Sequence, residues 1–120
     1  MSHEFYGATA RAVAEINRLL KLPATGREQD WEFELADPKR IHEMLNLLVL
    51  GNLNDECRSA LALLLLASME EQDSLEPRDL VQAKEWFLRN KRARDQMHFY
   101  WIQMSRATRP DLISRVLGIG

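Results

Sequence analysis

An unbroken run of eight apolar residues, Ala60 to Ala67, constrains the fold of this chain more than any other feature. It lies in the stretch ECRSALALLLLASMEEQD and is far shorter than the ~18–20 apolar residues of a membrane-spanning helix. Asn54 is suited to cap a helix that begins here, and Asp55 lies in its first turn, where the helix dipole favours a carboxylate. A helix with apolar residues on every side has to be covered by other elements. The run therefore predicts a central, buried helix over residues 54–70.

Most of the remaining sequence has the spacing of amphipathic helices, because apolar residues recur three or four positions apart. Asp37 is a good N-cap before Pro38, and Gly51 is suited to end the helix that starts there. A first helix is expected between Ser2, as its N-cap, and Pro23. Further helices are expected over about 38–50, 77–89, 91–106 and 110–117.

One short stretch, WEFEL, has a different period. Apolar residues alternate there with Glu32 and Glu34, a pattern typical of an extended segment with one buried face. No second strand candidate occurs in the sequence, so a sheet is not expected. The pattern predicts a short extended arm at about 30–35 that lies over the helices and exposes both glutamates.

The expected fold is all-α, a compact bundle of five to six helices around the central helix at 54–70. At 120 residues the chain is long enough to bury a core, and its 46% hydrophobic and 28% charged residues are typical of a globular protein. We therefore expect a single domain over residues 1–120. The N-terminus lacks the pattern of a secretory signal, and the single cysteine, Cys57, fits a reducing compartment. A cytoplasmic location is expected.

The titratable residues form no recognisable catalytic or metal-binding motif. His3, His42 and His98 are scattered, and neither H-E-x-x-H nor C-x-x-C occurs. Cys57 lies near a predicted helix start, where a thiol pKa can be lowered, but a free cysteine is more often a small buried hydrophobic residue. No phosphate-binding loop and no G-x-S-x-G motif is present. We expect no metal, no cofactor and no enzymatic activity.

Charge is divided unevenly along the chain. Residues 1–80 carry 15 acidic and 8 basic side chains, whereas residues 81–120 carry 3 acidic and 8 basic ones. Such a division can steer a charged partner, or it can reflect attraction between the two parts of the chain itself.

Five carboxylates gather around the end of the predicted central helix. The first two lie where the helix dipole disfavours negative charge, which indicates another demand on this site, such as a basic partner. The last two, by contrast, suit the start of the following helix. The predicted partner-binding residues are Glu70, Glu71, Asp73, Glu76 and Asp79, with Glu32 and Glu34 of the arm as further contacts.

The segment RNKRAR at 89–94 is basic and is followed by aromatic residues. Basic side chains beside exposed aromatic rings are typical of nucleic-acid binding, and Lys91, Arg92 and Arg94 would then contact the nucleic acid. Tyr100 and Trp101, however, have the helical spacing of core residues. The basic segment is then an ordinary solvated face, and nucleic-acid binding is the alternative interpretation.

The central helix resembles the core helix of a family of small all-helical bacterial immunity proteins. Members are encoded beside polymorphic toxins, as in contact-dependent growth inhibition systems. The likeness rests on Asp55-Glu56, Ala60-Leu61, the run from Leu64 to Glu70, Trp86, the pair Tyr100-Trp101, and Arg115 in ISRVLG. It covers about residues 37–117. This chain departs from the family at Leu63, where Glu is frequent, and at Arg58 or Ser59, where an aromatic residue is frequent.

The resemblance implies a cytoplasmic protein that binds a cognate toxin stoichiometrically and neutralises it without catalysis of its own. An acidic surface would suit a toxin whose active site is basic. The sequence leaves monomer and homodimer both open and does not identify the toxin. No membrane contact is expected. The alternative function is that of a helical regulator that binds nucleic acid through residues 89–94.

Overall fold

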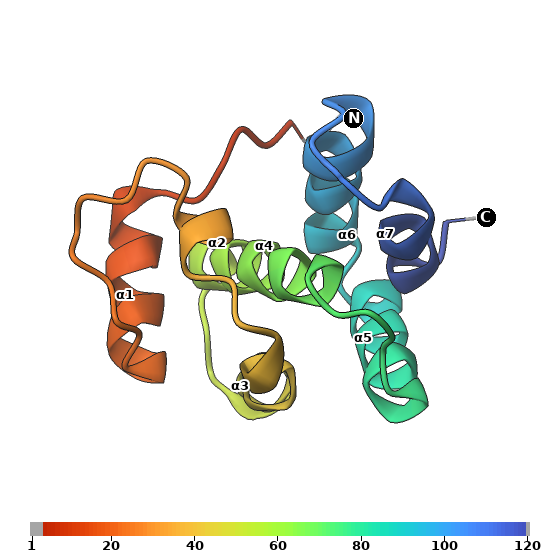
Figure 1. Ribbon diagram of the computed structural model, residues 1–120, viewed down its shortest axis with the longest axis horizontal. Helices are drawn as coiled ribbons and strands as arrows, with labels where there is room; N and C mark the ends of the chain where they lie inside the picture. The colour runs from red at the N-terminus through yellow and green to blue at the C-terminus, as the bar shows by residue number, and fades with distance from the viewer. Residues whose placement is uncertain (1–3, 120) are drawn as a thin grey trace.

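The computed structural model of the chain describes residues 4–119 and is drawn in Figure 1. The all-α class is confirmed, and no strand occurs in this range. The α-helices are α1 (Ala10–Leu20), α2 (Trp31–Glu34), α3 (Ile41–Leu50), α4 (Asp55–Glu70), α5 (Pro77–Arg89), α6 (Lys91–Met97) and α7 (Pro110–Leu117). A 3₁₀ turn, η1 (Pro38–Arg40), precedes α3, and a π-helical turn, η2 (His98–Gln103), continues α6.

Helix α4 begins where the sequence predicts. The Asn54 side chain accepts the backbone N–H of Cys57 at 2.9 Å, which satisfies one of the donors that a helix start leaves unpaired. Every residue from Ser59 to Met69 is buried. The helix packs against α1, α2, α3, α6 and α7.

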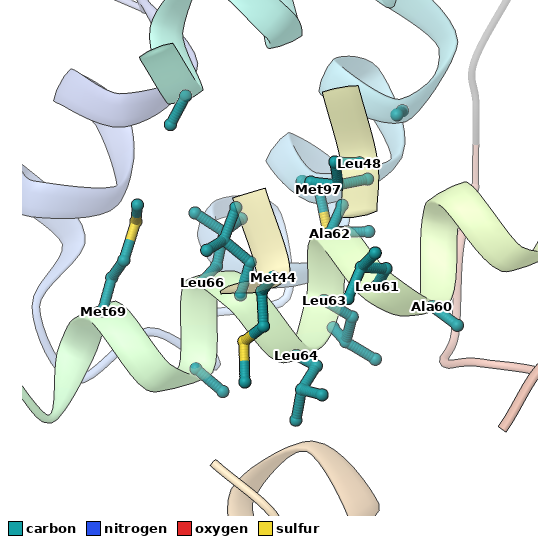
Figure 2. Close-up of a cluster of buried hydrophobic side chains, with 14 of the residues drawn as sticks. Met44, Leu48, Ala60, Leu61, Ala62, Leu63, Leu64, Leu66, Met69 and Met97 are labelled. Atoms are coloured by element: carbon teal, nitrogen blue, oxygen red, sulfur yellow. The ribbon is translucent and has the colours of Figure 1, made fainter. Parts of the chain in front are cut away.

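Side chains project from several sides of α4 into the core (Figure 2). Met44 and Leu48 of α3 and Met97 of α6 belong to the same cluster of buried side chains. Full burial of one such large apolar side chain stabilises the fold by about 1.5–3 kcal/mol. The apolar run 60–67 is therefore a structural element that leaves no surface for a ligand.

Helix α1 and the pair α5 and α7 lie at opposite ends of α4, whereas α3 packs below it in the view of Figure 1. Helix α1 packs beside its start, where Thr9 Oγ1 donates to the Glu56 carboxylate at 3.0 Å. Helices α5 and α7 pack on each other near its C-terminal end, and α7 also contacts η2. The two ends of α4 thus have different neighbours: α1 and its loops lie at the first, and α5 and α7 lie at the second.

The first helix starts later than predicted. Thr9 is its N-cap, since the Thr9 hydroxyl accepts the N–H of Ala12 at 3.2 Å. The predicted cap, Ser2, lies outside the described residues. Phe5 is buried although it precedes the helix, and its ring meets that of Tyr100 edge to face at 5.9 Å. The apolar spacing predicts Phe5 on a helix, whereas a non-helical segment places it in the same core.

The predicted extended arm is wrong: residues 31–34 form the single helical turn α2. Trp31 and Leu35 are four residues apart, lie on one face of the turn and are both buried. Glu34 reaches back and accepts the N–H of Asp30 at 2.8 Å, which stabilises the start of the turn. Apolar and polar residues that alternate over five positions are compatible both with a strand and with one helical turn. Because α2 was expected to be extended, the predicted count of five to six helices is below the seven observed in residues 4–119.

Candidate functional site

Two of the predicted partner-binding acids have internal roles. The Glu70 carboxylate accepts the backbone N–H of Arg109 at 2.7 Å and so caps the start of α7. Asp79 is buried, contrary to the expectation of a contact surface, and lies 3.4 Å from His42 Nδ1. The unfavourable position of Glu70 at the end of α4 is thereby explained within the fold.

Three acids of the cluster remain on the surface. Glu71, Asp73 and Glu76 are exposed and make no side-chain hydrogen bond or ion pair within the described part of the chain. They lie on the turn from α4 to α5, and we refer to these three residues as the acidic turn. Their charges are therefore available to another molecule.

The acidic turn is anchored from two sides. The Gln72 side chain donates to the carbonyl of Pro38 at 3.0 Å, and the Gln72 carbonyl accepts a hydrogen bond from the Arg109 guanidinium. One turn earlier, Ser68 Oγ accepts the N–H of Asp37 at 3.0 Å. These bonds hold η1 and the residue before it against the same end of α4.

The basic segment is divided in the same way. Lys91 and Arg92 are exposed, whereas the Arg94 guanidinium donates to the carbonyls of Leu117 and Gly118 at 2.7 and 3.1 Å. Arg94 thus satisfies carbonyl groups at the end of α7. Tyr100 and Trp101 are both buried, so neither offers a stacking face beside these cations.

The structure brings together a further group of residues that the sequence does not indicate. A pocket of about 620 Å³ lies between the segment before α1, α1 itself, the loop before α2, and η2. Its lining includes three carboxylates, Glu28, Asp30 and Glu32, and one cationic residue, Arg106. The aromatic lining residues are Tyr6, Trp31 and Tyr100.

Glu32 occupies the inner wall of this pocket. It is only 7% exposed, against the expectation that it faces solvent, and its carboxylate accepts a hydrogen bond from the Tyr100 hydroxyl. The Arg106 guanidinium carbon lies 5.0 Å from the centre of the Tyr100 ring. Burial raises the pKa of Tyr100 well above its ordinary value, and the hydrogen bond and the negative charge of Glu32 act in the same direction. The phenol therefore stays protonated and donates to the carboxylate.

The π-helical turn η2 explains how two adjacent aromatic residues are both buried. Met104 donates to the carbonyl of Phe99, five positions earlier, at 2.9 Å, so the turn is wider than an α-helical one. Tyr100 thereby points toward Glu32, while Trp101 enters the core. The Trp101 indole N–H is the buried side-chain donor that has no hydrogen-bond partner among the described residues.

The remaining candidates for chemistry do not form a site. Cys57 is buried, and burial raises its thiol pKa, aided by the nearby carboxylates of Glu15 and Glu56. A thiolate at the helix start is therefore disfavoured. Among residues 4–119 no group of three or more His, Cys, Asp or Glu side chains could hold a metal ion, and no helix has the length and apolar character to cross a membrane.

No family model, no curated protein and no solved structure matches the chain in the comparisons with known proteins.

The sequence could not indicate the pocket, because its walls come from segments far apart in the chain. The Trp31 indole N–H donates to Asn17 Oδ1 at 2.8 Å and so joins α2 to α1, and Tyr100 bonds a carboxylate 68 residues away. The one local signal was Glu32 between two aromatic residues. That pattern predicts a half-buried segment but does not indicate which of its side chains face the core.

Proposed function

We propose that this chain is an immunity protein that binds a cognate toxin stoichiometrically and neutralises it in the cytoplasm, with α4 as the central helix of its bundle. The observation that supports the proposal is the acidic turn, Glu71, Asp73 and Glu76, which is exposed and has no internal partner in the described residues. The resemblance of its helices to immunity proteins supports the same function. No catalysis is required of this chain.

The contact set is smaller than the sequence predicts. Glu70 and Asp79 support the fold, and Glu32 lies in the wall of the pocket. The proposed contacts are the acidic turn and, on α2, the exposed Glu34. Many toxins that act on nucleic acids have a basic active site, and clustered carboxylates both attract and occlude such a surface.

The anchoring of the turn favours tight association. Binding costs free energy when a loop has to be ordered, and a loop that is already fixed avoids that cost. Gln72, which lies between the proposed contacts, is held by bonds to Pro38 and Arg109. The carboxylates are thus presented on a preorganised surface.

Nucleic-acid binding through residues 89–94 gains no support of its own. Arg94 is engaged at the end of α7, and the two neighbouring aromatic residues with helical core spacing are buried. Two exposed cations, Lys91 and Arg92, are an ordinary solvated surface. We therefore advance no second function.

The test uses cells that express the product of the adjacent gene, with and without this chain. The wild-type chain should restore growth, and the double reversal Glu71→Lys, Asp73→Lys should reduce protection because association slows by about tenfold or more. The matched control, Glu85→Lys with Asp111→Lys, also reverses two exposed acids but lies off the turn. Thermal unfolding of both variants checks that each is folded.

The outcomes separate two claims. A neighbour that is harmless, or whose toxicity the wild-type chain does not relieve, would overturn the immunity function. Unchanged protection by the folded double reversal would overturn the role of the acidic turn and leave another surface as the contact.

A further inference from the structure

We propose that the pocket between α1, α2 and η2 binds a small organic cation through an ammonium group, with Glu32 as its anion. This ligand site goes beyond the proposed toxin binding and does not depend on it. The occupant is defined by its chemistry: an aliphatic primary ammonium, either of a free amine or at the tip of a lysine side chain.

The buried carboxylate is the first observation. Glu32 is 7% exposed and lines the pocket, and no ion pair joins it to a cation within residues 4–119. Its bond from the Tyr100 hydroxyl supplies one donor without neutralising the charge. Arg106 contacts Tyr100 and makes no ion pair with Glu32, so a positive group that enters the pocket gains both a charge partner and hydrogen bonds from this carboxylate.

The aromatic lining is the second observation. Trp31 and Tyr100 flank Glu32 in the wall, and Trp31 is fixed by its bond to Asn17. Aromatic faces attract ammonium and guanidinium groups, and the attraction is stronger where water is excluded. Arg106 already stands over the Tyr100 ring at 5.0 Å, so the chain's own guanidinium uses this ring and Trp31 is the aromatic residue proposed to meet the ligand.

Charge balance in the wall selects the sign of the ligand. Three carboxylates face one guanidinium there. The Glu28 carboxylate accepts hydrogen bonds from Thr25 and Gly26 of its own loop, but it still contributes a negative charge to the wall. An anionic ligand would have to approach a buried carboxylate, whereas a cation is attracted by all three acids.

The dimensions fit a small molecule. The volume of about 620 Å³ falls within the range of roughly 300–1,000 Å³ that is usual for ligand pockets. The combination of apolar walls with a few convergent polar groups is also usual for such sites. An aliphatic chain of a few carbons would lie against Val13 and Ala14 while its ammonium group reaches Glu32.

The experiment titrates the full chain with 1,5-diaminopentane by isothermal calorimetry. The neutral analogue 1,5-pentanediol and the anion pentanoate have similar chains and serve as ligand controls. The diamine should bind about tenfold or more tightly than either. The variant Glu32→Gln should weaken diamine binding by about tenfold or more. The control Glu34→Gln removes the same charge from the same helix outside the pocket and should leave diamine binding unchanged.

A second variant guards against misfolding of Glu32→Gln. Ala14 is exposed on α1 and lines the pocket, so Ala14→Phe fills the mouth without disturbing the core. It should abolish diamine binding while the melting temperature is retained. Equal binding of diamine and diol, or diamine binding that survives both Glu32→Gln and Ala14→Phe, would overturn the proposal.

A parallel titration with Nα-acetyl-lysine methylamide distinguishes the two sources of the ammonium group. Binding of the diamine supports a free amine as ligand. Tighter binding of the lysine derivative than of the diamine supports a basic side chain of a protein partner. Binding of neither overturns the site, and the result bears in no way on growth protection through the acidic turn.

Discussion

The Glu70 carboxylate at the end of α4 accepts the backbone N–H of Arg109 at the start of α7, 39 residues further along the chain, at 2.7 Å. A carboxylate is unfavourable at the C-terminal end of a helix, as in α4, and favourable at the N-terminal end, as in α7. The reason is that the two helix ends carry opposite partial charges. Glu70 thus stabilises the start of α7, although its position is unfavourable for α4.

Replacement of Glu70 tests this cap. Glu70→Ala should lower the free energy of unfolding by about 1–2 kcal/mol, because it leaves an N–H at the start of α7 without its acceptor. Glu70→Gln should lose less, since the amide oxygen still accepts. Urea denaturation measures both. The control Glu71→Ala removes an exposed carboxylate and should change stability by less than about 0.5 kcal/mol; equal losses at Glu70 and Glu71 would contradict the assignment.

The core of α4 gives a larger expected effect. Leu64 is fully buried, so Leu64→Ala should destabilise the fold by about 3–5 kcal/mol through lost transfer energy and a cavity. The control Leu50→Ala makes the same substitution at a position that is 81% exposed. It should lower the free energy of unfolding by less than about 0.5 kcal/mol. Thermal and urea unfolding report the difference. Similar values for the two variants would show that the apolar run is not the core.

Cys57 provides a test by chemical labelling. The thiol is buried, and its pKa is raised by burial and by the charges of Glu15 and Glu56, so the reactive thiolate is scarce at neutral pH. Labelling with a thiol reagent should be about a hundredfold or more slower in the native protein than in denaturant, because it requires opening of the fold. Labelling of the native protein at the rate of the denatured chain would contradict the burial.

The sequence predicted the helices with clear local signals. Asn54 before a long apolar run, and Pro77 and Pro110 at first positions, each depend on a few adjacent residues, and α4, α5 and α7 begin where these residues predict. Segments without a strong local signal were misplaced. Gly7 and Thr9 interrupt the predicted first helix. The five residues at α2 alternate as in a strand, yet they form a helical turn.

The candidate sites were less accessible to sequence reasoning, because side-chain partners are set by tertiary contacts. The same acidic stretch contains a helix cap at Glu70, a buried contact of Asp79 to His42 and an exposed turn between them. Composition cannot separate these roles. The pocket depends on a bond between Glu32 and Tyr100 across 68 residues, and no spacing rule connects such positions.

Tyr100 predicts a specific loss of stability at alkaline pH. Its folded pKa lies above the ordinary value of 10.0, so above pH 10 the unfolded chain releases the phenol proton while the folded chain keeps it. This contribution is complete below pH 10 and decreases by up to about 1.4 kcal/mol per pH unit above it. The chain has two tyrosines, so in Tyr6→Phe the ultraviolet absorbance of tyrosinate reports Tyr100 alone. Tyrosinate should form only as the fold is lost; ionisation near pH 10 with native circular dichroism would contradict the Glu32–Tyr100 bond.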